Sequence, residues 1–540
     1  MKSQSLILSI IAGVLLVAAW PVSPFTFLIF FAWIPILFIA EQEKKTLRFF
    51  WYTYLTLLIW NAGTTWWIWN ATGPGAIAAV IGNSFFMIVP LWGFYSFKKK
   101  FGSKVGYVSF VVFWLTFEYI HLTWQLSWPW LTLGNVFATH PNWVQWYEYT
   151  GVSGGSLWVL LSNLSVFLLI KNWKTLLPIR RTQLLSIRLV ILFLPLGLSK
   201  LVQPKEAIAS STQAPVPNVV IVQPNIDPYS EKFDFASTSG QIHKLISLSE
   251  KQIDSSTKLV LWPETALPVA VWQDKVNENY NYKPVFDFVN RHPQLTLLTG
   301  IETFKNYGTE KATNTAHKNE ADGTYYDAFN AAVSITANQP LQFYNKSKLV
   351  PGVEKLPDFL LWLGAIFEKF GGTAGGYGHD KEANVFKVPA NPYVTAPIIC
   401  YESIYGEYIT NYVRKGANLL TIITNDGWWA NTGGHKQHLN YARLRAIETR
   451  KWIARSANTG ISAVIDPQGN IVERRAWDTS DVIKYNIPAV RGETFFVRNG
   501  PLIFKLAVFF TAALLMYNIV MLLKRRFLSG AITNSTIKTT

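Results

Sequence analysis

The sequence predicts a helical membrane protein that carries one large α/β domain outside the bilayer. Seven long apolar runs lie within the first 202 residues, and an eighth lies close to the C-terminus. The long stretch between them alternates short β-branched runs with polar helical ones. Aromatic residues make up 15% of the chain and 23 of them are tryptophan, which is typical of proteins with aromatic belts at membrane surfaces.

Most of the apolar runs approach the ~20 residues that a helix needs to cross a hydrocarbon core. They cover residues 5–20, 24–40, 50–69, 76–96, 106–125, 155–170, 188–202 and 502–523. The first run follows Lys2 and so resembles a signal peptide, but no clear small-x-small cleavage site ends it. We therefore expect eight transmembrane helices, and we expect the first of them to be retained.

Basic residues in the loops predict the orientation of these helices. They follow the second, fourth, sixth and eighth runs, at Lys44, Lys45, Arg48, Lys98, Lys99, Lys100, Lys104, Lys171, Lys174, Arg180, Arg181, Lys524, Arg525 and Arg526. The alternate loops, 70–75 and 127–154, contain no Lys or Arg. Because short loops rich in Lys and Arg stay in the cytoplasm, both termini are expected there, with residues 203–498 on the opposite side.

The charge balance separates the regions of the chain. The whole chain has 49 Lys and Arg against 33 Asp and Glu, but residues 203–498 have 30 against 29. The basic excess therefore belongs to the membrane part, and nucleic-acid binding loses its support. We expect a membrane domain over 1–202, a polar linker over 203–217, an α/β domain over 218–498, a last transmembrane helix over 499–526 and a cytoplasmic tail over 527–540.

Local patterns place the elements of the α/β domain. Strands are expected at 219–222, 259–262, 295–298, 331–335, 396–399, 419–423 and 461–465, and helices at 237–255, 285–291 and 437–454. The glycine-rich stretch 371–378 lacks a phosphate-loop lysine pattern and is expected to be a loop. This order predicts a mixed, layered α/β domain.

Cys400 is the single cysteine, and it lies where an expected buried strand meets a turn. A thiol held there is suited to attack a carbonyl group, because the thiolate is the nucleophile and nearby cations lower its pKa. Most free cysteines, however, are small buried hydrophobes. With one cysteine the chain forms no intramolecular disulfide, so cysteine usage leaves the redox compartment open.

Three polar stretches after other strands favour a catalytic role for this cysteine. The first is Leu-Trp-Pro-Glu, where Glu264 is expected to have a raised pKa in an apolar setting and to act as a general base. The second carries Lys346 and Lys348 on one extended face, where an ammonium would lower the thiol pKa and stabilise an oxyanion. The third is Thr-Asn-Asp-Gly-Trp-Trp at 424–429. The alternatives are a helix N-terminal acid, a solvated lysine and an ordinary turn.

Together these stretches resemble the nitrilase superfamily, whose members use a Glu-Lys-Cys triad. The matching order is Trp-Pro-Glu-Thr, Tyr-x-Lys-x-x-Leu-Val-Pro, Cys-Tyr-Glu and Asn-Asp-x-Trp. With seven apolar runs before the domain and one after it, the whole chain is similar to the apolipoprotein N-acyltransferase family, the membrane-embedded branch. The resemblance implies an α-β-β-α sandwich for residues 218–498.

The resemblance also implies a two-step acyl transfer at the outer face of a bacterial inner membrane. Cys400 would attack an acyl ester of a phospholipid, typically phosphatidylethanolamine, and form a thioester. The α-amine of a diacylglyceryl-cysteine on an apolipoprotein would then take the acyl chain. Glu264 would act as the base and Lys346 would stabilise the oxyanion. The family's chemistry implies no cofactor.

Further residues follow from the same resemblance. Those expected to support the triad are Glu354, Tyr401 and Glu402, and those expected to bind substrate are Phe233, Asn330 and Trp428. Two positions depart from the family pattern. The family reads Pro-Phe-Gly-Glu where this chain has Pro-Gly-Val-Glu, which moves the glycine beside Glu354 and puts the local turn in doubt. Phe233 replaces a usual tryptophan and keeps its stacking area without the indole donor.

Other interpretations of the sequence remain open at this point. A membrane-tethered amidase would have the same triad, although one anchor would suffice for it. A non-catalytic scaffold or transporter is opposed by the triad and by the scarcity of charges, such as Glu118, within the spans. His435 and His438 are three apart without an apparent carboxylate or cysteine partner, so no metal is expected. The Trp-Pro-Trp at 128–130 forms either an aromatic belt or a lining for lipid entry.

Overall fold

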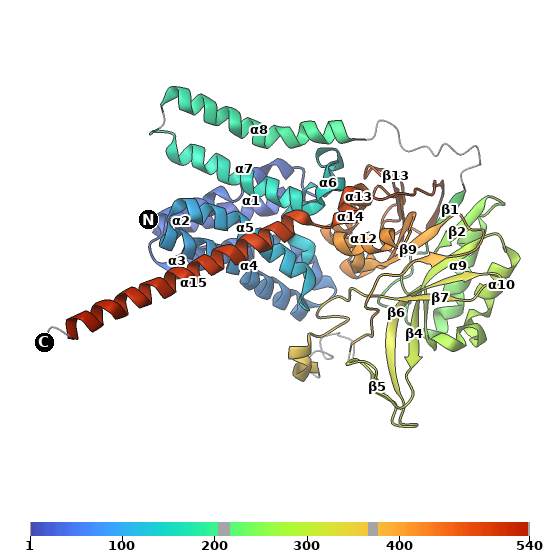
Figure 1. Ribbon diagram of the computed structural model, residues 1–540. Helices are drawn as coiled ribbons and strands as arrows, with labels where there is room; N and C mark the ends of the chain where they lie inside the picture. The colour runs from blue at the N-terminus through green and yellow to red at the C-terminus, as the bar shows by residue number, and fades with distance from the viewer. Residues whose placement is uncertain (1, 176, 204–216, 365–375, 538–540) are drawn as a thin grey trace.

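A computed structural model describes residues 2–175, 177–203, 217–364 and 376–537 of the chain. Figure 1 shows a helical bundle on one side of the molecule and a domain of two sheets on the other. Most of the expected linker, part of the glycine-rich stretch and the end of the expected tail lie outside the described residues, at 204–216, 371–375 and 538–540.

Each apolar run coincides with helical structure. The main helices of the bundle are α1 (Lys2–Ala19), α2 (Ile34–Gln42), α3 (Thr46–Thr65), α4 (Gly73–Phe101), α5 (Ser103–Thr123), α7 (Val152–Asn172), α8 (Pro178–Val202) and α15 (Leu502–Ile537). Helix α15 lies along the bundle although it is almost 300 residues from α8 in sequence (Figure 1). Its Thr511 is hydrogen-bonded to Thr116 of α5, with 2.8 Å between the hydroxyl oxygens.

Five helices among the described residues are long and apolar enough to cross a membrane, namely α4, α5, α7, α8 and the Leu502–Arg525 part of α15. The second apolar run differs from the expected single helix. It forms a short 3₁₀ helix, Thr26–Phe30, followed by the nine-residue α2. At 1.5 Å per residue, α2 spans about 14 Å, which is about half of a hydrocarbon core.

Two sheets form the α/β domain. The first has the order β14-β1-β2-β4-β6-β5, with β3 on β4 and β7 on β6. Its strands are β1 (Asn218–Gln223), β2 (Thr257–Leu261), β3 (Leu267–Trp272), β4 (Thr296–Asn306), β5 (His317–Lys318), β6 (Tyr325–Thr336), β7 (Gln342–Asn345) and β14 (Asp481–Asn486). The second sheet has the order β13-β12-β11-β10-β9-β8. Its strands are β8 (Phe386–Lys387), β9 (Val394–Ile399), β10 (Leu419–Thr424), β11 (Ile453–Ala457), β12 (Ala463–Ile465) and β13 (Ile471–Arg474).

Alternation along β1 explains how the layers pack. Val220 and Val222 lie in a core with α9 (Thr238–Glu250) and α10 (Lys283–Arg291). Val219 and Ile221 point the other way, into a core shared with the second sheet. That sheet is covered on its far face by α12 (Gly406–Arg414) and α13 (Gly433–Thr449). Successive side chains of a strand face opposite sides, and the result is the expected α-β-β-α order.

Several expected boundaries are wrong for local reasons. The helix expected at 437–454 ends at Thr449, because Arg450 adopts a left-handed conformation with φ of 51° and β11 begins at Ile453. The strands expected at 295–298 and 331–335 are parts of the much longer β4 and β6. Pairing between β4 and β6 runs over eleven positions and extends both strands beyond their apolar centres.

The two tryptophans of the Trp-Pro-Trp loop differ in burial, and the half-buried Trp128 stacks on Tyr401. Trp130 is fully buried, and its Nε1 donates to Oε1 of Gln437 in α13 at 2.6 Å. At the same place, Trp20 of the bundle donates to the Tyr441 hydroxyl at 3.0 Å, and Tyr441 donates to the Trp130 carbonyl at 3.0 Å. These contacts fasten the α/β domain to the bundle, because a buried indole N–H needs an acceptor.

Candidate active site

Cys400 lies at the carboxyl end of β9, between β10 and the edge strand β8 of the second sheet, and begins a 3₁₀ turn that ends at Ile404. Its backbone adopts a left-handed conformation, with φ of 49°. This conformation costs a non-glycine residue of the order of 1–3 kcal/mol, and the surrounding structure must hold it. Two donors on the Cys400 carbonyl oxygen do so: Ser403 Oγ at 2.8 Å and His438 Nε2 at 3.1 Å.

Glu264 follows β2 and is almost fully buried. Its Oε1 accepts hydrogen bonds from Asn330 Nδ2 at 2.8 Å and Lys346 Nζ at 3.1 Å, and its Oε2 accepts from the Asn425 backbone N–H at 3.0 Å. The turn needs a glycine beside it, because a Cβ at Gly300 would lie 2.7 Å from the Glu264 Cα. Glu264 is thereby held between the two sheets.

The expectation of a raised pKa for Glu264 is wrong. Burial raises the pKa of this carboxyl, but Lys346, Asn330 and Lys232 together lower it below the usual value. Cations and hydrogen-bond donors favour the charged form of an acid. Glu264 is therefore ionised at neutral pH and able to accept a proton.

Lys346 directly follows β7, a four-residue strand that pairs with β6 and that the sequence analysis did not predict. Its side chain is 1% exposed, and Nζ lies 3.1 Å from Glu264 Oε1 and 2.7 Å from Glu354 Oε1. Burial lowers the pKa of Lys346, but the two carboxylates outweigh it and hold the pKa well above the ordinary lysine value. The ammonium is permanently charged.

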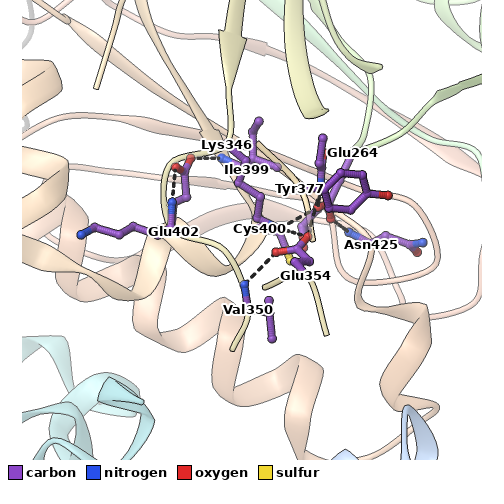
Figure 2. Close-up of polar contacts among 12 residues, drawn as sticks. Glu264, Lys346, Val350, Glu354, Tyr377, Ile399, Cys400, Glu402 and Asn425 are labelled. Carbon is purple, nitrogen blue, oxygen red and sulfur yellow. Dashed lines mark hydrogen bonds and ion pairs between the residues drawn. The ribbon is translucent and has the colours of Figure 1, made fainter. Parts of the chain in front are cut away.

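Glu354 lies in this cluster despite the shifted glycine. Its Oε1 accepts from Lys346 and from Asn330 Nδ2 at 3.2 Å, and its Oε2 accepts from the Val350 backbone N–H at 2.8 Å. Gly352 supplies the left-handed position of the turn, with φ of 83°. Figure 2 shows Glu264, Lys346 and Glu354 converging beside Cys400.

The thiol itself is protonated at rest. Burial raises the pKa of Cys400 and the charge of Glu264 raises it further, whereas Lys346 lowers it. The first two effects prevail, so the expected net lowering by lysine does not occur. A thiol of this kind needs a base during the reaction.

Glu402 and Tyr401, which were expected to support the triad, contact the segments on either side of Cys400. Glu402 is fully buried and lies on the side of Cys400 away from Glu264 (Figure 2). It accepts hydrogen bonds from the Tyr344 hydroxyl at 2.5 Å and from the backbone N–H of Ser347 at 2.8 Å and Ile399 at 2.9 Å. It thereby joins the strand end of the cysteine to the segment of the lysine. The Tyr401 hydroxyl donates to the Ser127 carbonyl in the outer loop of the bundle at 2.9 Å.

The three residues expected to bind substrate fall into two places. Asn330, in β6, donates to both site carboxylates and so orients them. Phe233 is 52% exposed and stacks on the half-buried Trp428, with ring centroids 6.3 Å apart and planes 18° from parallel. These two rings form an aromatic surface next to the site.

Lys232 was not singled out from the sequence, although it belongs to the site. It is 2% exposed, and its Nζ donates to the Glu264 backbone carbonyl at 2.8 Å. Burial lowers the pKa of Lys232 to about 8, and the charges of Glu264 and Glu302 limit the fall. Lys232 lies in a polar, irregular stretch, which is the sequence pattern of a solvated lysine. Its position directly before Phe233, an expected substrate-binding residue, is the one signal in the sequence that connects it with the site.

His438 belongs to a buried hydrogen-bonded cluster with Asp426 and Arg455. Its Nδ1 lies 2.9 Å from Asp426 Oδ1, and Arg455 Nη2 lies 2.6 Å from Asp426 Oδ2. All three side chains are fully buried. Since the other ring nitrogen faces the Cys400 carbonyl and Ser403, both nitrogens of His438 are engaged in positioning the nucleophile's backbone.

A carboxylate, a lysine and a cysteine at convergent strand ends of a four-layer sandwich define the class of carbon–nitrogen hydrolases. The family model "Carbon-nitrogen hydrolase" matches residues 218–494. A second model, "Apolipoprotein N-acyltransferase N-terminal domain", matches residues 12–165.

Several proteins that are similar to this chain over most of its length share one name. The apolipoprotein N-acyltransferase of Chlorobaculum tepidum is 32% identical over 518 residues, which cover 93% of this chain and 94% of the relative. That of Geobacter metallireducens is 26% identical over 510 residues, covering 92% and 91%. That of Azotobacter vinelandii is 28% identical over 428 residues, covering 78% and 75%. The chain therefore belongs to the apolipoprotein N-acyltransferase family.

Proposed function

We propose that the protein transfers an acyl chain from a phospholipid, with phosphatidylethanolamine as donor, to the α-amine of a diacylglyceryl-cysteine on an apolipoprotein. The observation that carries this proposal is the buried Lys346 between Glu264 and Glu354, beside the nucleophile candidate Cys400. Family membership supplies the class of reaction, and the bundle of apolar helices keeps the site where lipid esters are available.

In the first half-reaction, Glu264 takes the proton of the Cys400 thiol as sulfur attacks the ester carbonyl carbon. The carbonyl oxygen becomes negative, and the Lys346 ammonium stabilises it. An ammonium has three N–H donors, and in the described part of the chain two of them meet Glu264 and Glu354. The third is directed to substrate. The C–O bond then breaks, Glu264 returns the proton to the departing oxygen, and a lysophospholipid leaves the thioester.

In the second half-reaction, the neutral α-amine attacks the thioester carbonyl. Its excess proton passes to Glu264, the C–S bond breaks, and the proton returns to the sulfur of Cys400. The product is an amide, and the enzyme is restored. Glu354 supports this step, because its partly exposed carboxylate beside Lys346 is able to accept a hydrogen bond from the incoming amine and orient it. The first half-reaction has no incoming amine, since its nucleophile is the Cys400 thiol.

Lys232 places a second positive charge next to the proposed base, Glu264, through its contact with the Glu264 backbone. Its contact with the Glu264 carbonyl fixes the turn that begins at Thr265, where φ is 46°. Its charge also acts on Cys400. Lys232 is thus a positioning residue that favours the charged, proton-accepting form of Glu264.

We also propose how the chain is oriented in the membrane. Eight transmembrane segments place both termini in the cytoplasm and the catalytic domain, over 218–498, in the periplasm, joined to the first seven by the 203–217 linker. The supporting observation is the alternation of basic and neutral loops. Reporter fusions near Asn306 and near Lys100 are expected to report opposite sides of the membrane. The same side for both would overturn this topology.

The acyl transfer is tested with a phospholipid that has a tagged acyl chain, with and without a diacylglyceryl lipopeptide. The tag is expected on the full-length protein without acceptor and on the lipopeptide amine with it. Cys400→Ser is expected to carry no thioester, since an alkoxide needs stronger activation than a thiolate. Release of tagged fatty acid to water at the same rate with and without the lipopeptide would instead identify an amidase-like hydrolase.

A further inference from the structure

A groove of about 340 Å³ lies where the catalytic domain meets the outer end of α5. One wall is Leu122–Ser127 of the bundle, and the other comes from the segment after Lys346 and from residues 379–381. The wall residues used below are Ser127, Ser347, Lys348, Lys355, Asp380 and Lys381. The groove therefore adjoins both the membrane-facing bundle and the strand end that supplies the site lysine.

The groove is positively charged. Lys348 and Lys355 are half-buried and Lys381 is exposed, and none has a carboxylate oxygen within 4.0 Å in the described part of the chain. Among the groove residues, Asp380 is the one carboxylate, and it accepts two hydrogen bonds from Asn345, both of 3.0 Å. Three cations thus face one carboxylate whose oxygens are already engaged.

Lys348 is held in place by aromatic rings. Its Nζ lies 5.5 Å from the Tyr405 ring centroid and 5.2 Å from that of Tyr408. Cation–π contact of this kind fixes the direction of a flexible ammonium. Burial lowers the pKa of Lys348, and the charges of Glu402 and Glu407 oppose the fall. A partly desolvated cation without a close carboxylate attracts an anion strongly.

The groove is connected to the nucleophile on both walls. Ser127 accepts a hydrogen bond from Tyr401, the neighbour of Cys400. On the opposite wall, the backbone N–H groups of Ser347 and Lys348 donate to Glu402, which also holds Ile399 before the cysteine. A ligand in the groove would therefore contact residues that directly follow Lys346 and a loop that is hydrogen-bonded to the neighbour of Cys400.

We propose that this groove binds the phosphate of the donor lipid's headgroup, with Lys348, Lys355 and Lys381 as its cationic contacts. A phosphodiester is anionic and needs several N–H donors, which lysine supplies as point charges. The acyl esters of the same lipid extend from the phosphate towards the bundle and Cys400. This assignment rests on the proposed function, since it names the part of the donor that the site recognises.

The test uses the full-length protein in mixed micelles of a neutral detergent, where the donor's mole fraction is varied. A triple variant, Lys348→Gln with Lys355→Gln and Lys381→Gln, is compared with a matched surface variant, Lys251→Gln with Lys275→Gln and Lys311→Gln. The matched lysines are exposed on the same domain, outside the groove. The groove variant is expected to need about tenfold more phosphatidylethanolamine for half-maximal acyl loading, because even one lost hydrogen bond to a charged group costs on that order. Its maximal loading rate, and both parameters of the surface variant, are expected to stay within about twofold of wild type, within the scatter of surface changes.

A second acyl donor distinguishes a loss of headgroup binding in the groove from a loss of acyl transfer at Cys400. Tagged diacylglycerol has the same acyl ester but no phosphate, so wild type and groove variant are expected to load from it equally. Inorganic phosphate is expected to be a weak inhibitor; if it blocks loading at the same concentration as glycerophosphoethanolamine, the groove is a site for free phosphate. Equal half-saturation of the two triple variants with phosphatidylethanolamine, or an equal loss with diacylglycerol, would overturn the groove assignment. Wild type that loads from neither donor would overturn the proposed function instead.

Discussion

Two buried charge clusters lie close to Cys400, and they differ in whether they are closed to solvent. The Asp426–His438–Arg455 cluster is completely buried, and Asp426 accepts from Thr424, His438 and Arg455 at 2.8, 2.9 and 2.6 Å. The Glu264–Lys346–Glu354 cluster is nearly as buried, but the Glu354 side chain keeps 12% exposure, and within the described residues two of the three Lys346 N–H donors are engaged.

The difference separates a structural cluster from a reactive one. A fully buried ion pair fixes geometry, and removal of one partner leaves an uncompensated charge. The closed cluster does this for the Cys400 backbone through His438. A cluster with an open face is able to respond when charge develops on a substrate. Variants in the two clusters should therefore lose different properties.

The largest effect on acyl loading within these clusters is expected for Lys346→Met. The change removes the cation that contacts both carboxylates of the open cluster. Loss of an oxyanion donor lowers the rate about 10²–10³-fold. The measurement is thioester formation on Cys400 from tagged phospholipid. A loss below about tenfold would assign the oxyanion to other donors.

Glu354→Ala is expected to separate the two half-reactions. Glu264 and Lys346 remain paired, so loading of Cys400 continues at a rate within about tenfold of wild type, whereas transfer to the lipopeptide amine falls at least about a hundredfold, in the range of lost proton-transfer groups. The assay follows bound tag before and after acceptor is added. Complete turnover would exclude Glu354 from the reaction, and absence of loading would make it part of the first step.

Lys232→Met is expected to lower loading about tenfold, since one charge-assisted hydrogen bond behind the base is lost. The variant also has a pH signature. The pKa of Lys232 is lowered to about 8 in the folded protein, below the unfolded lysine value of about 10.4. The unfolded state therefore binds more protons between these values, and this lysine's contribution to stability rises with pH there.

Melting temperatures of wild type and Lys232→Met, measured from pH 7 to 10, should accordingly diverge in favour of wild type above pH 8. A constant difference across this range would show that Lys232 titrates normally. Lys244→Met is the control, because this lysine also donates to a backbone carbonyl, that of Asn225, but its side chain is only partly buried.

The smallest effect on chemistry is expected in the closed cluster. Arg455→Met leaves Asp426 buried with one partner fewer, which costs about 3–5 kcal/mol of folding free energy. Loading per folded molecule should stay within about threefold of wild type, since the hydrogen bonds of Arg455 among the described residues go to Ile461, Asp426 and His438. Loss of loading at unchanged melting temperature would show that this cluster is reactive after all.

The sequence by itself determined the two-part architecture and the position of the site along the chain. Apolar runs gave the helices of the bundle, and strand patterns gave β1, β2, β9 and β10 within about two residues of their ends. Glu264 and Cys400 were proposed from the sequence because each lies just after a short apolar strand, β2 in the first sheet and β9 in the second. These features depend on neighbours in sequence.

Only the tertiary structure decided the electrostatics and the packing between segments. The pKa of Glu264 is lowered by Lys346 and Asn330, which lie 82 and 66 residues away. Trp130 is buried by α13, which lies more than 300 residues away in sequence. The sequence around Lys232 is typical of a solvated lysine, whereas in the structure this lysine is buried against the Glu264 backbone. Local pattern encodes which residues form a helix or strand. The burial and partners of a charge depend on contacts between distant segments, and those same contacts determine what the charge does.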